Sequence, residues 1–315
     1  MAAAAAIAIP AVAMSQEVAV VVKIDGIPWY NLHGQGVEQA GEDLGMTAFQ
    51  VGPVDADPAQ QVKIIEDLIA RGVNAIAVVP NDANVLAPVL TKAQENGIVV
   101  VTNESEGQEG SDWNVEVTIP DDFAVKIFED MAQGMGGTGD YAVFVGTLTA
   151  PLHNYWADVG IEYIAENYPD MNLVTDRFGV AESVEDSRAT TLDLMKAYPD
   201  LAGIAAMGSL GPIGAGQALT ELGQEEQVFV SGTVIPNQGM RYLRTGAIDR
   251  GTLWSPIVNG YVMAATAKAI MDGEEIADGF SIPGAGEATV NQETRNIQFH
   301  AILDITAENV AEFGF

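Results

Sequence analysis

The chain has 315 residues, of which 44 are acidic and 13 are basic, so its formal net charge is −31. Such a charge repels nucleic acid and excludes the basic surface that DNA- and RNA-binding proteins use. We attribute it to adaptation to a salty medium, where salt screens the charge, rather than to a surface for a basic partner. The absence of cysteine excludes disulfides, thiolate metal sites and cysteine nucleophiles. The length indicates two domains.

The first residues bear on the compartment. Residues 2–10 form a short apolar run, and Ala11-Val12-Ala13 fits the small-residue pattern that precedes a signal-peptidase cut. The run is too short to span a membrane. An alanine-rich N-terminal helix of the fold is the alternative. We interpret residues 1–14 as a signal-peptide remnant and expect an exported, periplasmic protein.

The next residues alternate between apolar strands and amphipathic helices. Asp57-Pro58 opens a helix, Gly72 ends it, and a fully apolar stretch follows at 75–79. Continuous apolar strands between amphipathic helices predict βαβ units and a parallel sheet that is covered on both faces. The predicted elements are a strand at 18–22, a helix at 31–44, a strand at 47–51, helices from 57 to 72 and from 82 to 97, and strands at 75–79 and 98–101.

The alternation restarts after residues 118–121, where Pro120 can begin a helix but cannot continue a strand. Further crossings are expected near 251–254 and at 283–291. The remaining predictions are helices at 121–135, 155–168, 185–197, 212–222 and 259–271, and strands at 141–145, 173–175, 203–206 and 228–230. The fold class is therefore α/β, with two doubly wound parallel-sheet lobes joined by three crossing segments. The N-terminal lobe comprises residues 15–118 and 255–284, and the C-terminal lobe comprises residues 119–254 and 285–315.

Nothing in the sequence supports an enzyme, a metal or a cofactor. The glycine motif at 134–139 fits the dinucleotide fingerprint only formally, because it follows a helix and precedes a strand. His33, His153 and His300 show no metal-ligand spacing. The pairs Asp121-Asp122 and Glu104/Glu106 are typical of solvated faces or helix starts in so acidic a chain.

Polar and aromatic side chains at the carboxyl ends of the predicted strands form a more coherent set. Ligands bind at this edge of an open α/β sheet. Aromatic faces surrounded by carboxylates, amides and hydroxyls suit a polyhydroxylated ligand, although each tryptophan could instead be a core residue. The candidate binding residues are Lys23, Trp29, Tyr30, Glu104, Ser105, His153, Asn154, Ser209, Thr233 and Trp254.

Several motifs in this order resemble the periplasmic sugar-binding proteins of ABC importers, of the ribose-binding type. The resemblance runs from about residue 17 to about residue 291. Its most specific element is the series GVNAI at 72–76, PND at 80–82 and TNE at 102–104. Two further motifs also match, namely YPDLAGI at 198–204 and GQAL at 216–219. It implies the type I periplasmic binding fold and capture of a neutral sugar or polyol between the lobes. We also expect delivery to a membrane permease and a monomeric protein.

Within this family the chain is similar to the branch of rhamnose-type and autoinducer-2 receptors. Lys23 stands at that branch's ligand-binding lysine, and Glu104 at the family's sugar-binding aspartate. Leu152 and His153 replace the Asp-Gln pair of autoinducer-2 receptors. Ser105, Val234 and Trp254 replace an arginine, an aspartate and a glutamine of ribose receptors, which argues against ribose. The alternatives are a receptor for autoinducer-2 or a sugar that serves signalling, the effector half of a repressor, and an enzyme.

Overall fold

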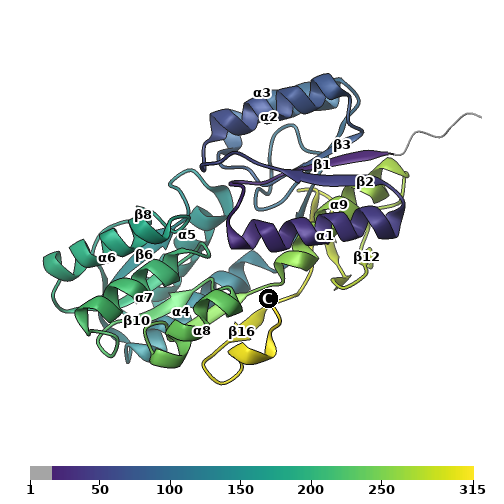
Figure 1. The fold of residues 1–315 in the computed structure, drawn as a ribbon. Coiled ribbons are helices and arrows are strands. Elements are labelled where there is room, and N and C mark those ends of the chain that lie inside the picture. Colours follow the sequence, from purple (N-terminus) through teal and green to yellow (C-terminus); the bar gives the residue numbers. More distant parts are fainter. Residues whose placement is uncertain (1–15) are drawn as a thin grey trace, which may run out of the picture.

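The computed structural model describes residues 16–315, so the expected signal peptide lies outside the described residues. Figure 1 shows two lobes, each built on one sheet with helices on both faces. In spatial order, the first sheet contains β14 (Thr289–Asn291), β15 (Asn296–Gln298), β5 (Trp113–Glu116), β4 (Val99–Thr102), β3 (Ala75–Val78), β1 (Glu17–Val21) and β2 (Thr47–Val51). All its neighbouring pairs are parallel except β14 and β15.

The second sheet repeats the same winding. Its order is β16 (Leu303–Ile305), β11 (Arg250–Leu253), β10 (Phe229–Gly232), β9 (Leu201–Ala206), β6 (Thr138–Val145) and β7 (Asp170–Leu173), and β8 (Phe178–Gly179) pairs with the end of β6. The order β2-β1-β3-β4-β5 is thus matched by β7-β6-β9-β10-β11. In each sheet the first strand of the lobe lies inside the sheet rather than at its edge. This reversal creates the crevice at which open α/β sheets bind ligands. The expected α/β class with two doubly wound lobes is confirmed.

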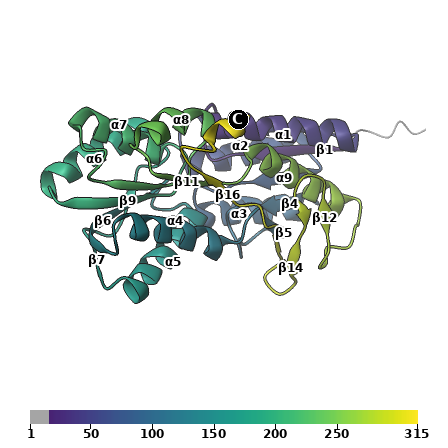
Figure 2. The same cartoon turned by 90° about the horizontal axis from the view of Figure 1, so that it is seen from below.

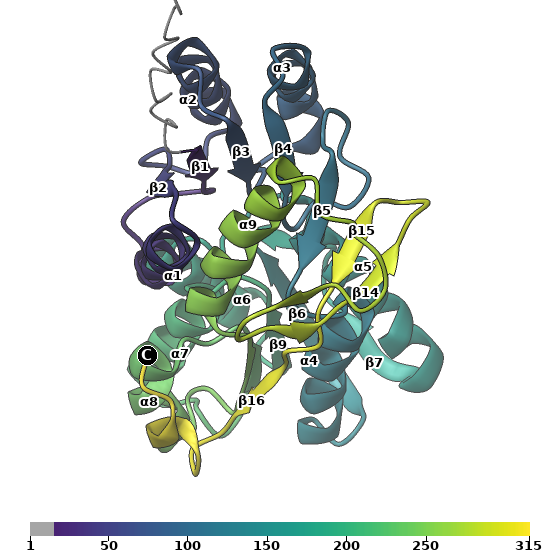
Figure 3. The same ribbon diagram turned by 90° about the vertical axis from the view of Figure 1, so that its right-hand side faces the viewer.

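The helices cover both faces of each sheet. In the first lobe, α2 (Pro58–Arg71) and α3 (Ala83–Glu95) lie on one face, and α1 (Pro28–Leu44) and α9 (Pro256–Met271) lie on the other, as Figure 3 shows. In the second lobe, α4 (Pro120–Gly134) and α5 (Pro151–Asn167) lie opposite α6 (Val184–Ala197), α7 (Gly211–Leu222) and α8 (Pro236–Thr245), as seen in Figure 2. Six of these helices have proline as their first residue, where its fixed φ suits the helix and its missing N–H costs nothing.

Strands β1, β3 and β4 form the apolar centre of the first lobe. Side chains of one face, such as Ile76 and Val78, pack with α2 and α3 in a separate cluster. Side chains of the other face, such as Val20 and Ala77, belong to a core that continues into the second lobe. Residues 259–271, which were expected to return to the first lobe, belong to α9, and α9 packs on α1 and on β1, β3 and β4.

The third crossing is not where the sequence suggested. Residues 283–291 were expected to cross, but β14 and β15 form a hairpin that joins the first sheet beside β5. The Asn291 carboxamide accepts the N–H groups of Glu293 and Thr294, which closes this turn. The chain therefore crosses after Gln298, next to the first crossing, where Phe299 N–H donates to the Glu116 carbonyl. A small hairpin of β12 (Ser281–Ile282) and β13 (Gly286–Glu287) occupies the expected position.

Several elements had no clear sequence signal. Strand β5, the two-residue strand β8 and helix α8 were not predicted, and the 3₁₀ helix η1 (Val310–Glu312) lies close to the C-terminus. The glycine motif at 134–139 joins the end of α4 to the start of β6, as its order predicted. Asp121 and Asp122 are exposed in the first turn of α4. No helix within residues 16–315 is long and apolar enough to cross a membrane.

Candidate ligand-binding site

A cavity lies between the lobes at the carboxyl ends of both sheets. About 320 Å³ of space between its walls is not filled by protein atoms, a figure that includes open solvent. Its lining residues come from both lobes and are Trp29, Tyr30, Glu104, His153, Trp156, Glu182, Gly208, Ser209, Thr233 and Trp254. This is the crevice that the strand order predicts.

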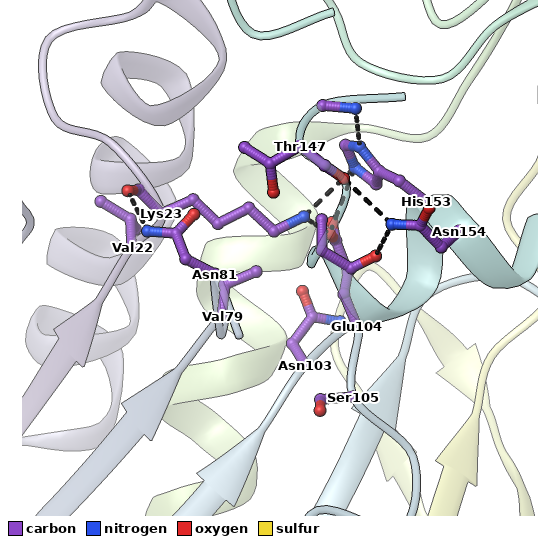
Figure 4. A network of polar contacts seen from close by, with 12 residues as sticks. Val22, Lys23, Val79, Asn81, Asn103, Glu104, Ser105, Thr147, His153 and Asn154 are labelled. Atoms are coloured by element: carbon purple, nitrogen blue, oxygen red, sulfur yellow. Dashed lines mark hydrogen bonds and ion pairs between the residues drawn. The ribbon is translucent and has the colours of Figure 1, made fainter. Parts of the chain in front are cut away.

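A charged triad crosses the interface beside this cavity. Figure 4 shows the Lys23 ammonium and the Glu104 carboxylate of the first lobe converging on the His153 ring of the second. Lys23 donates to Glu104 Oε2, and His153 Nε2 lies 3.2 Å from Lys23 Nζ and 3.5 Å from Glu104 Oε2. The Gly146 N–H donates to His153 Nδ1 over 3.0 Å, which leaves Nε2 to carry the proton toward Glu104. The two lobes are therefore in contact, in a closed arrangement.

The triad is almost completely shielded from water. Lys23 is 1% exposed and Glu104 is 3% exposed. Burial by itself raises the pKa of Glu104, but the Lys23 charge and the hydrogen bond from His153 outweigh it and lower that pKa to about 2. Glu104 is consequently ionised at any physiological pH, and its charge is balanced by Lys23.

Buried amides hold Lys23 in place. The Asn81 side chain donates to the Lys23 carbonyl over 2.7 Å. Gln61 donates to the carbonyls of Val22 and Val79 and accepts from the Asn81 N–H. These bonds tie the ends of β1 and β3 to helix α2. The lysine therefore leaves the sheet in a fixed direction, toward the second lobe.

Glu104 is held in an uncommon backbone conformation. Its φ is 61°, a left-handed value that costs a non-glycine residue on the order of 1–3 kcal/mol. The Glu116 side chain accepts three hydrogen bonds. The donors are the Glu104 N–H at 2.9 Å, the Asn114 amide at 2.8 Å and the Asn103 amide at 3.1 Å. Burial raises the pKa of Glu116 to about 8. This network turns the Glu104 side chain toward the cavity and Lys23.

Aromatic rings form the walls of the cavity. The Trp29 and Trp254 ring centroids are 5.4 Å apart and nearly perpendicular, and Trp156 lies 5.7 Å from Trp254. The His153 ring stacks on Trp156 with an angle of 15° between their planes. Both Trp29 and Trp254 are buried in the shared core as well as facing the cavity. The two interpretations of these tryptophans, cavity wall and core, are thus compatible.

Four polar groups of the cavity lining are buried without a hydrogen-bond partner in the described part of the chain. They are the hydroxyls of Ser209 and Thr233 and the indole N–H groups of Trp156 and Trp254. A buried polar group that lacks a partner typically costs about 1–3 kcal/mol. All four lie in the second lobe. A ligand with several hydroxyl groups could satisfy them together.

The structure brings most of the predicted site residues together. Seven of the ten line the cavity: Trp29, Tyr30, Glu104, His153, Ser209, Thr233 and Trp254. Lys23 lies behind this lining and contacts two of its members. Trp29 and Tyr30 were expected in a loop, but Pro28 starts α1 earlier and places them in its first turn. His153 and Asn154 likewise belong to the first turn of α5, which begins at Pro151.

Besides Lys23, two predicted residues do not line the cavity. The Ser105 hydroxyl donates to the Gln108 side chain over 3.0 Å. The Asn154 amide donates to the carbonyls of Thr147 and Ala150, and its own carbonyl oxygens accept from Arg177. These local bonds fix loops and a helix start instead.

Three lining residues were not predicted. Trp156 had a usable signal, since it follows His153 by three residues on a helix and therefore shares its face. Glu182 follows β8, which is too short to be recognised in the sequence. Gly208 has a φ of 136°, and a Cβ there would lie 2.7 Å from the Ala181 Cβ. Only glycine fits that close approach.

The site shows no arrangement for a metal. Within residues 16–315, no group of three or more histidine, aspartate or glutamate side chains is placed to hold an ion. His33 and His300 do not line the cavity: His33 bonds to the Gln50 side chain, and His300 lies within hydrogen-bond distance of the Thr289 hydroxyl. The chemistry available here is hydrogen bonding, ion pairing and apolar contact.

Comparison with known proteins assigns the chain to a family. Residues 18–275 match the model of the periplasmic binding protein domain, so the chain belongs to that family. A xylitol-binding protein of Mycolicibacterium smegmatis is 26% identical over 230 residues, which are 70% of this chain and 62% of the relative. A D-ribose/D-allose-binding protein of Pseudomonas aeruginosa is 25% identical over 56% of this chain and 57% of its own length. The matches thus span less than two thirds of these relatives.

Solved structures share the whole fold. An ABC transporter solute-binding protein from Clostridium phytofermentas with bound L-rhamnose has 25% identity and a TM-score of 0.87, over 95% of this chain and 98% of that one. LsrB from Clostridium saccharobutylicum in complex with AI-2 has 22% identity and a TM-score of 0.87, over 95% and 100%. The resemblance to periplasmic sugar-binding proteins is therefore confirmed at the level of family and fold.

Proposed function

We propose that the chain is a periplasmic solute-binding protein that captures a neutral sugar or polyol between its lobes and delivers it to an ABC-type permease. It acts as a monomer, and it binds its ligand without changing it chemically. The observation that carries this proposal is the set of four unpartnered polar groups on an aromatic-walled cavity. Hydroxyl groups satisfy such donors and acceptors, and aromatic faces pack on the C–H surface of a sugar.

The ligands of similar proteins support this ligand class. The relatives are described as binding xylitol or ribose and allose, and one similar structure holds L-rhamnose. Xylitol is a polyol and the others are neutral sugars. The chain's departures from the ribose-type pattern, among them Trp254, point away from ribose itself.

Contacts across the lobes provide the coupling between binding and closure. Besides the triad, the Thr149 hydroxyl of the second lobe donates to the Asn81 carbonyl of the first over 2.9 Å. A ligand shifts the equilibrium between open and closed forms only through its higher affinity for one of them. A ligand that bonds Glu104 on one side and Ser209 or Thr233 on the other binds only the closed form tightly. The permease then recognises that form.

A thermal-shift panel tests the proposal. The panel contains xylitol, D-ribose, D-arabinose, L-rhamnose, D-galactose and autoinducer-2. A ligand at about 100 times its dissociation constant adds about 2.7 kcal/mol of stability. We expect at least one neutral sugar or polyol to raise the unfolding temperature, with calorimetry confirming one site per chain. The double variant Ser209→Ala/Thr233→Val should show a smaller shift at the same ligand concentration and keep the fold. A response to autoinducer-2 alone, or to nothing, would contradict the proposal.

A further inference from the structure

Glu182 is the cavity residue whose role is unassigned. It follows β8 and immediately precedes Ser183, whose side chain caps helix α6 by accepting the Asp186 N–H. The backbone of this segment is fixed to the sheet, because Val180 N–H and Ala181 N–H both donate to the Val145 carbonyl. Glu182 therefore has a rigid base on the second lobe.

The carboxylate of Glu182 has no hydrogen bond to any residue of the described chain, although it is partly buried in the cavity lining. It lies beside His153 against Gly146, where a Cβ would be 3.0 Å from Glu182 Oε1 and 2.6 Å from His153 Nδ1. Gly146 therefore makes room for both side chains. Glu182 also borders a second groove, which opens between Asp55 of the first lobe and Asp186 of the second. It thus stands where the cavity meets the mouth of the cleft.

The charges around the cavity do not cancel. Lys23 balances Glu104, and the Gly146 N–H directed at Nδ1 leaves His153 a neutral ring. Glu182 is then the one uncompensated charge among the residues that line the cavity in this structure. Burial raises the pKa of Glu182, and the Glu104 charge raises it further, while the Lys23 charge opposes this. Above that pKa, an anionic ligand meets net negative charge in a poorly hydrated site, where repulsion is strong.

We infer that Glu182 is a specificity-determining residue that accepts a hydrogen bond from a ligand hydroxyl at the cleft mouth and excludes sugar acids. This inference rests on the proposed function and deepens it. A neutral sugar or polyol donates to the carboxylate and supplies the partner it lacks. An aldonic or uronic acid places a second carboxylate at the same position and is rejected. The ligand class is therefore restricted to molecules without negative charge.

Matched ligand pairs test this at pH 8. Each pair differs by one oxidised carbon: xylitol with xylonate, D-ribose with ribonate, D-arabinose with arabinonate, L-rhamnose with rhamnonate, and D-galactose with galacturonate. For each neutral ligand that binds the parent protein, calorimetry measures its affinity and that of the corresponding acid. The quantity compared is the ratio of the first affinity to the second. Because Glu182→Gln keeps the shape and removes the charge, we expect the neutral ligand to bind about tenfold more weakly. The ratio should fall by a further factor of about ten, because the acid gains affinity.

Asp186→Asn is the control, since it removes a charge from the adjacent groove without touching the cavity lining. It should leave the ratio unchanged. Glu182→Gln, and Glu182→Ala as a second replacement, should unfold no earlier than the parent without ligand, since no hydrogen bond of the described fold uses the Glu182 carboxylate.

The outcomes separate the inference from the proposed function. An unchanged ratio in Glu182→Gln, an acid that still shows no measurable binding to it, or an equal change in Asp186→Asn overturns the role of Glu182 and leaves the proposed function intact. A parent protein that binds none of the neutral members overturns the proposed function and the inference with it.

Discussion

The two halves of the cavity differ in how completely their polar groups are satisfied. Among the lining residues of the first lobe, none has a buried side-chain polar atom without a partner in the described part of the chain, and Glu104 bonds to Lys23. Behind the lining, Asn81 and Glu116 hold the backbones of Lys23 and Glu104, although the Asn81 Oδ1 atom itself has no partner there. On the second lobe, Ser209 and Thr233 have buried hydroxyls without partners among residues 16–315. The first half is ordered by its own contacts, whereas the proposed function leaves the polar groups of the second half to be satisfied by the ligand.

This difference suggests a division of labour between the lobes. A preorganised half loses little conformational freedom on binding, so it can receive the ligand first. The unsatisfied half gains hydrogen bonds only when it closes over the ligand, and this gain favours the closed form. Four predictions, in order of decreasing expected effect, test the contrast.

Removing the Lys23 ammonium should have the largest effect. Lys23→Met keeps much of the apolar stem but leaves the Glu104 carboxylate buried without its counter-charge. Breaking one partner of a buried ion pair costs about 3–5 kcal/mol. Urea unfolding should show a loss of this size, and calorimetry a clear drop in affinity because Glu104 loses its orientation. Small-angle scattering should show less compaction at a given ligand concentration.

The double variant Lys23→Met/Glu104→Gln is the control for this prediction. It removes both charges, so its stability should recover toward that of the parent while its affinity stays low. A single variant that unfolds, binds and closes like the parent would show that the pair does not organise the first half.

The second prediction concerns Glu104 and acid. Its pKa is lowered from 4.5 to about 2, so its ionised form stabilises the fold at any pH above about 4.5. This contribution, about 3 kcal/mol by linkage, is lost as the pH falls from 4.5 through 2. Glu104→Gln lacks it, so the stability gap between parent and variant should be full at pH 7 and should shrink below pH 4.5. Urea midpoints from pH 7 to pH 3 measure the gap.

Binding should weaken in the same variant, by about 1.5–3 kcal/mol, because a charged acceptor becomes a neutral one. A gap that is constant between pH 7 and pH 3 would show that Glu104 is not held ionised by Lys23.

The third prediction addresses the aromatic wall. Trp254→Phe keeps a ring in contact with Trp29 but removes the unpartnered indole N–H and part of the apolar area. We expect a loss of about 1–2 kcal/mol in binding free energy by calorimetry. Trp113→Phe is the control, because Trp113 lies on β5 outside the cavity lining. Equal affinities for the two variants would mean that Trp254 serves the core alone.

The alternation of apolar strands and amphipathic helices made the fold predictable. Most helix starts were marked by proline, and the strands at 18–22 and 75–79 are apolar throughout because both faces of each sheet are covered. The hairpin of β14 and β15 was missed because its pairing with β5 is a contact between distant residues. The local sequence of residues 289–298 does not indicate which sheet the hairpin joins.

The site was predictable where a residue directly follows a recognisable strand. Lys23, Glu104 and Thr233 meet this condition and lie in or beside the cavity. Asn154 does not meet it, since it comes nine residues after the predicted strand at 141–145, and its side chain bonds to Arg177 and to the start of α5 instead. Glu182 was missed because β8 has two residues, and its lack of a partner is a property of the folded cavity alone.

The fourth and smallest effect is the sharpest test of the second half. Thr233 follows β10, where its N–H donates to the Ala206 carbonyl and fixes the backbone, while its hydroxyl has no partner in the part of the chain described. Thr233→Val replaces that hydroxyl by a methyl group of similar shape. Without ligand the variant should be as stable as the parent or slightly more so, because an unsatisfied polar group is removed. With ligand it should lose about 0.5–1.5 kcal/mol of binding free energy.

Ser231→Ala is the control for this prediction. It removes an equally unpartnered hydroxyl two residues earlier that does not line the cavity, so the affinity of this variant for the ligand should not change. If calorimetry gives the two variants the same affinity, the ligand does not bond to the Thr233 hydroxyl. The proposal that the ligand satisfies the unpartnered polar groups of the second lobe would then be wrong for this residue.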